Sequence, residues 1–140
     1  MSAVAASASH TSGAIITEVV LQGIRRFGDV RRFTFGPGYN VVHGLASSGK
    51  TTLHDVLLSL LFATPAEGEK EAFASLLPQG KVACRAGMTL SLGNELWRVL
   101  KDYQQGVTTL SRFNAAEKRF DLVLSDVPAI QRWLVETARF

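Results

Sequence analysis

The residues best suited to chemistry lie together in residues 44–51, which read GLASSGKT. This segment fits the pattern G-x-x-x-x-G-K-[ST], in which glycines allow main-chain amides to curl around an anion. Lys50 would supply a cation for phosphate oxygens, and the Thr51 hydroxyl would be a ligand for Mg²⁺. The spacing therefore predicts a nucleotide-phosphate site made of Gly44, Leu45, Ala46, Ser47, Ser48, Gly49, Lys50, Thr51 and Thr52. The alternative is a Gly-Ser turn that precedes a helix by coincidence.

A phosphate loop of this kind must lie between a strand and a helix. Residues 39–43 form a short apolar run, which predicts a buried strand leading into the loop. Apolar residues recur at helical spacing after Lys50 and stop before Thr64-Pro65, so a helix is predicted to begin at the loop. Its N-terminus would add a partial positive charge to the phosphate site.

The rest of the sequence predicts mainly strands. Residues 14–24 and 31–35 are apolar or alternating, and four further strands are predicted at residues 84–92, 95–103, 107–113 and 118–124, as an antiparallel meander. Ser125 or Asp126 is the predicted N-cap of a final helix, with Pro128 in its first turn. Together these elements predict an α/β fold: a P-loop NTPase lobe with a mixed sheet around the phosphate-loop helix, an antiparallel β-meander and a C-terminal helix.

Length and composition indicate one small soluble domain. The chain has 140 residues, of which 46% are hydrophobic and 19% charged. No apolar run approaches the length that a membrane helix needs, so no membrane partner is expected. Residues 1–13 are predicted to be a disordered leader, and residues 14–140 a single lobe. Cys84 has no partner for a disulfide, which agrees with a cytoplasmic protein, and it is interpreted as a buried strand residue without a catalytic role.

Basic and aromatic residues gather before the loop. The pairs Arg25-Arg26 and Arg31-Arg32 lie near Phe27 and Phe33, and the net charge is +3. Such a combination could attract phosphate or nucleic acid, or it could be the solvated side of a hairpin that covers a hydrophobic face. His43 and His54 are interpreted as packing or surface residues.

Residues 19–57 resemble the N-terminal head segment of the SMC-like, RecF-like and SbcC-like ATPases of chromosome maintenance and repair. The residues that match this family's pattern are Gly38, Asn40, Gly44, Gly49, Lys50, Thr51 and Asp55. The resemblance implies ATP with Mg²⁺ as ligands, Arg25 near the phosphates, Asn40 as a support of the loop, and a structural role for Asp55. The family usually has Asn-Gly where this chain has Ala46-Ser47, so turnover is more affected by this departure than binding.

Hydrolysis requires an acidic metal ligand at the end of an apolar strand. This sequence contains only a poor match to such a strand, in residues 121–126. Asp126 is the only candidate, and its position before Pro128 favours an N-cap instead. In the resembled family, the acidic strand belongs to a C-terminal segment beyond a coiled coil. The resemblance therefore implies three alternatives: an N-terminal piece of a longer ATPase, a lobe completed by a second chain, or binding without hydrolysis.

Three functions follow as expectations. The first is the ATP-binding half of an ATPase head, active only when a second lobe completes it, with a head-to-head dimer and a role in DNA repair or chromosome maintenance, DNA being a possible partner. The second is a small stand-alone P-loop kinase or NTPase, with Asp126 as metal acid on a parallel strand. The third is a regulatory P-loop domain that does not hydrolyse nucleotide.

Overall fold

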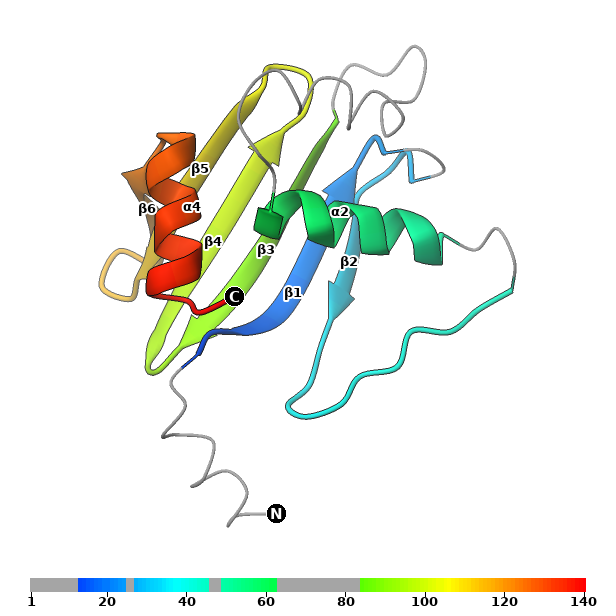
Figure 1. Ribbon diagram of the computed structural model, residues 1–140, viewed down its shortest axis with the longest axis horizontal. Coiled ribbons are helices and arrows are strands. Elements are labelled where there is room, and N and C mark those ends of the chain that lie inside the picture. The colour runs from blue at the N-terminus through cyan, green and yellow to red at the C-terminus, as the bar shows by residue number, and fades with distance from the viewer. Residues whose placement is uncertain (1–12, 25–26, 46–48, 63–83) are drawn as a thin grey trace.

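The computed structural model describes residues 13–24, 27–45, 49–62 and 84–140. Within them the chain forms one six-stranded sheet and two helices, and both helices lie on the same face of the sheet (Figure 1). The strands follow the order β2-β1-β3-β4-β5-β6. The elements are β1 (Ile15–Gln22), β2 (Arg31–Thr34), α2 (Lys50–Phe62), β3 (Arg85–Leu92), β4 (Glu95–Asp102), β5 (Val107–Asn114), β6 (Arg119–Leu124) and α4 (Val127–Glu136).

The predicted α/β fold class is wrong. Every pairing between the described strands is antiparallel, whereas a P-loop NTPase lobe requires a sheet that contains parallel strands. The predicted and the observed fold first differ at residues 39–43, which were predicted to form a strand and do not form one. Tyr39 and Val41 there are 105% and 82% exposed. A strand needs a neighbour for its N–H and C=O groups, and an apolar sequence pattern does not supply one.

The four strands predicted in the second half are present as β3 to β6, an antiparallel meander. The β3–β4 turn contains Gly93, with φ of 61°, and the β4–β5 turn contains Gly106, with φ of 71°. Glycine adopts this left-handed backbone without the steric cost that a Cβ brings. The Gly-containing turns between alternating apolar runs were therefore sufficient to predict this part of the sheet.

The hydrophobic core lies between the sheet and its two helices. Side chains alternate along each strand, so one set from β1, β3 and β4 points toward the helices. The helix-facing core residues of these strands include Val19, Leu21, Met88, Leu90 and Val99. On α4, Ile130 and Leu134 are buried, and Trp133 packs on Trp97 of β4 with ring centroids 4.8 Å apart. Burying each large aliphatic side chain stabilises the fold by about 1.5–3 kcal/mol.

The C-terminal helix α4 begins and ends with specific caps. The carboxylate of Asp126 accepts a hydrogen bond from the Ala129 N–H at 3.3 Å, which confirms the predicted N-cap. At the other end the carbonyl of Trp133 accepts from the N–H groups of Thr137 and Ala138. The Ala138 carbonyl then accepts from the N–H of Ala14 at 2.9 Å, so the end of the chain is bonded beside the start of β1. Of the helices in the described residues, none is long and apolar enough to cross a membrane.

Cys84, directly before β3, is 2% exposed, and burial was predicted for it. Burial, and then the negative charge of Asp102, raise the pKa of its thiol from 9.0 to about 11. Between these values the unfolded chain releases the thiol proton while the folded chain keeps it. We therefore expect the free energy of unfolding to fall as the pH rises from about 9 to about 11. Below pH 9 the protonated thiol makes its full contribution to stability.

Urea unfolding at pH 8 and pH 10.5 measures this effect, with Cys84→Ala as the control. Other groups also titrate in this range, so the contribution of Cys84 is the part of the decline that Cys84→Ala removes. An equal decline in both proteins would show that the thiol is not the group responsible.

Candidate functional site

The phosphate-loop motif is followed by a helix, as predicted. Helix α2 begins at Lys50, and the Leu53 N–H donates to the Gly49 carbonyl at 3.0 Å as the first helical bond. Gly49 has φ of 105°, a conformation that residues with a Cβ rarely adopt. The first helical turn carries no acidic side chain, so its partial positive charge is not neutralised from within the helix. This helix N-terminus is therefore favourable for an anion.

The Lys50 side chain turns back over the motif. Its ammonium donates to the carbonyl of Gly44 and, at 3.3 Å, to the carbonyl of Leu45. Gly44 and Leu45 begin the motif and Lys50 follows its last glycine, so the ammonium spans the two ends of the loop. Both bonds are exposed, and phosphate oxygens are stronger partners for an ammonium than neutral carbonyls are.

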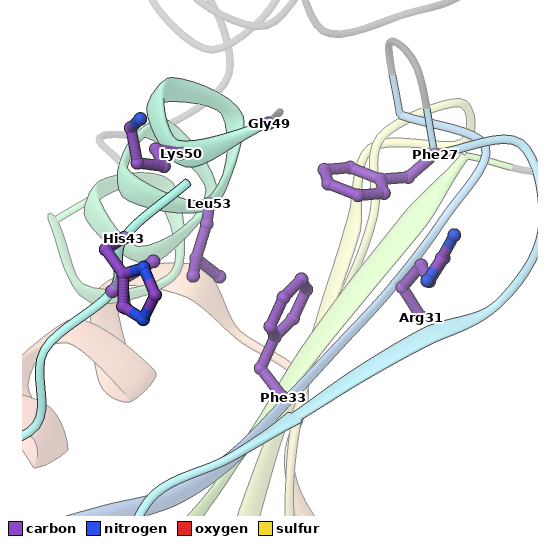
Figure 2. Close-up of a pocket in the computed structure, with 8 residues that line it drawn as sticks. Phe27, Arg31, Phe33, His43, Gly49, Lys50 and Leu53 are labelled. Carbon is purple, nitrogen blue, oxygen red and sulfur yellow. The ribbon is translucent and has the colours of Figure 1, made fainter. Parts of the chain in front are cut away.

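A cavity of about 290 Å³ lies beside this junction (Figure 2). Phe27 and Phe33 form one wall and meet edge to face, with ring centroids 6.0 Å apart. The Phe27 ring also lies directly against Gly49, where an added Cβ would be 2.3 Å from its Cζ. The lining residues are Phe27, Arg31, Phe33, Val42, His43, Gly49, Lys50 and Leu53. The cavity lining thus combines an aromatic wall with two basic residues, Arg31 and Lys50, and one histidine.

Arg31 is the basic residue that sequence reasoning did not assign to the site. On β2, Arg31 pairs with Leu21 and Arg32 pairs with Val20, so the two arginines point to opposite faces of the sheet. Arg31 lines the cavity, whereas Arg32 bridges to Glu18 at 2.6 Å. The arginine pair was visible in the sequence, but the choice between its members follows from the strand register. His43, interpreted as a packing or surface residue, also lines the cavity.

The other predicted site residues fall into three groups. Thr51 is exposed, whereas Thr52 is 5% exposed. The Asn40 amide bonds with Gly36 and Gly38, which places it at the turn before the loop; its predicted support of the loop stays a prediction. Arg25, Ala46, Ser47 and Ser48 lie outside the described residues.

The described residues offer no cluster of metal-ligating side chains. Among the residues that the structure describes, no group of three or more His, Cys, Asp or Glu side chains could hold a metal ion. A phosphate-bound Mg²⁺ does not need such a group, because it keeps several waters and takes most other ligands from phosphate oxygens. Thr51, which is exposed in the first turn of α2, carries a hydroxyl that fits that mode of binding.

Asp126 does not have the setting that a metal acid requires. The strand before it, β6, pairs antiparallel with β5, whereas the stand-alone kinase or NTPase requires a parallel strand ending at this residue. Its carboxylate also caps α4. The described residues therefore place no acidic metal ligand of this kind at the end of β6.

Comparison with known proteins adds no assignment. A scan against protein-family models finds no matching family, and a search of curated proteins finds no matching relative.

Proposed function

We propose that this chain binds ATP with Mg²⁺ through residues 44–52. The observation that carries the proposal is the junction at Gly49 and Lys50, where a left-handed glycine leads directly into a helix whose first turn lacks acidic residues. The lysine ammonium at this junction already bonds to two loop carbonyls, so it lies within reach of an anion held by the loop. The proposal depends on this local geometry and not on the predicted fold class.

The arrangement supports definite roles. The amides of the loop and of the first turn would donate to the phosphates, and Lys50 would neutralise their charge. Thr51 would hold the Mg²⁺ ion through its hydroxyl. Arg31 is proposed as a second cation for the phosphates, since it lines the same cavity as Lys50. Bound Mg²⁺ supplies further neutralisation of the phosphate charge.

We further propose that hydrolysis needs a second lobe or a second chain, as in the SMC-like and RecF-like ATPases that the loop resembles. Exposed apolar residues support this: Val41 and Val42 before the loop are 82% and 47% exposed, and Leu45, the second residue of the loop, is 85% exposed. A strand added beside residues 39–43 would pair their backbone, and a second lobe packed on it would cover the apolar side chains. Dimerisation of heads and action on DNA are proposed from the same resemblance alone.

Thermal unfolding with and without Mg-ATP tests nucleotide binding. A ligand that binds only the folded chain stabilises it by about 2.7 kcal/mol at a hundred times its Kd. Trp97 and Trp133 pack together between β4 and α4, so their fluorescence should report the transition. We expect the Tm to rise with millimolar Mg-ATP and not with AMP, which lacks the outer phosphates.

The two arginines of β2 provide a matched pair for the same measurement. We expect the Arg31→Ala variant to need about ten times more Mg-ATP for the same rise in Tm, because one charge-assisted contact is lost. Arg32→Ala should leave it unchanged, because that side chain bridges to Glu18 on the other face. Absence of protection in the unmodified chain at millimolar Mg-ATP would rule out the proposed function.

A further inference from the structure

A buried lysine lies against the last described turn of helix α2. Lys101 of β4 is only 4% exposed, and its ammonium donates to the Ser59 carbonyl at 3.0 Å. Ser59 lies in the last described turn of α2, which ends at Phe62. Lys101 thus binds the described turn of α2 that lies farthest from Lys50.

Tyr103 makes a second polar contact with the same turn. Its hydroxyl is hydrogen-bonded to the Ser59 Oγ, which is bonded in turn to the Val56 carbonyl at 2.8 Å. A carbonyl can only accept, so the serine hydroxyl donates to Val56 and the tyrosine hydroxyl donates to the serine. The Tyr103 N–H also donates to the Cys84 carbonyl at 2.9 Å. Tyr103 is therefore held by the sheet while it holds the helix.

Apolar packing alone does not define the rotation of α2 well. Leu53, Val56 and Leu60 are buried, but Leu57 and Leu61 are only partly buried and Leu58 is 44% exposed. Leucines thus cover much of the helix circumference, and a rotated helix would bury a similar amount of apolar surface. Buried hydrogen bonds are directional and are satisfied at one rotation and one axial position, which is how buried polar groups specify register.

We propose that Lys101 and Tyr103 are positioning residues for the phosphate site. By holding the last turn of α2 they set the rotation of the whole helix, and so the direction in which Lys50 and Thr51 leave its first turn. Ser59 lies nine residues beyond Lys50, about 13 Å along the axis at the usual helical rise, so neither residue touches the nucleotide itself. The inference rests on the proposed function for its effect on ATP, but not for its effect on the helix.

The test uses the full chain with Lys101→Met and Tyr103→Phe, and Lys118→Met as the control at an exposed hairpin position. Hydrogen exchange is followed in α2 and in the strands β3 to β6, and Mg-ATP affinity is measured by titrated thermal protection. We expect Lys101→Met to speed exchange in α2 at least tenfold relative to β3–β6 and to weaken Mg-ATP binding about tenfold. Tyr103→Phe should speed exchange in α2 and weaken Mg-ATP binding by about threefold each. Lys118→Met should change neither the exchange nor the affinity.

The outcomes separate the possible explanations. If Lys101 and Tyr103 only stabilise the fold, their replacement would speed hydrogen exchange in α2 and in the strands alike and would leave the Mg-ATP affinity of the folded chain unchanged. That result overturns the proposal. Unchanged exchange in α2 overturns it as well. If the unmodified chain shows no protection by Mg-ATP, the proposed function fails, and exchange in α2 still decides whether these residues hold the helix. If Lys101→Met does not fold, Tyr103→Phe decides, because it removes only a hydroxyl.

Discussion

Lys50→Ala is expected to reduce Mg-ATP affinity by about a hundredfold, because it removes the ammonium that would bind the phosphates at the loop. Hydrogen bonds to charged groups contribute about 1.5–3 kcal/mol each, and a loss of about 2.7 kcal/mol corresponds to this factor. The stability of the free chain should change little, since Lys50 is exposed and bonds to exposed loop carbonyls. The measurement is the Tm as a function of Mg-ATP concentration.

Lys118→Ala is the matched control for Lys50→Ala. Lys118 is an exposed lysine in the β5–β6 turn, so its replacement removes the same charge far from the loop in sequence and outside the cavity lining. Mg-ATP should protect this variant as it protects the unmodified chain. Equal protection of the Lys50→Ala variant would mean that the nucleotide does not use the loop, and the proposed function would have to be abandoned.

Gly49→Ala is expected to destabilise the free chain by about 2–4 kcal/mol, since it adds overpacking to backbone strain. The new Cβ would be 2.3 Å from the Phe27 Cζ, and the Phe27 ring is 9% exposed and packed against Phe33. The φ of 105° is unfavourable for alanine in addition. Urea unfolding measures the loss without any ligand, so this prediction stands apart from the proposed function.

Substitutions at two other glycines and one double variant separate backbone strain from overpacking against Phe27. Gly38→Ala introduces strain alone, because its φ is 83° and nothing lies within 4 Å of the added Cβ. Gly36→Ala introduces neither and should be nearly neutral. Phe27→Ala alone leaves a cavity, but combined with Gly49→Ala it should cost less than the sum of the two single changes. Simple additivity would show that the ring does not press on the glycine.

The fold and the site make different demands on the sequence. The phosphate-loop motif is local, and its helix begins at Lys50 where the spacing places it. A mixed sheet is not local, because it needs parallel neighbours for residues 39–43, and the described strands offer none. The resemblance of forty residues to an ATPase head therefore supports a proposal about the loop, while the P-loop fold class does not hold for the described residues.

Much of this protein was determined by sequence alone, because the relevant signals are short in range. Gly-containing turns between alternating runs predicted the meander, helical spacing predicted α2, and Asp126 before Pro128 predicted the cap of α4. The pairing of β1 with β3, the choice of Arg31 over Arg32, and the contact of Phe27 with Gly49 required the tertiary structure. Each depends on how segments distant in sequence are aligned, and a shift of one residue in strand register reverses which side chains face the site.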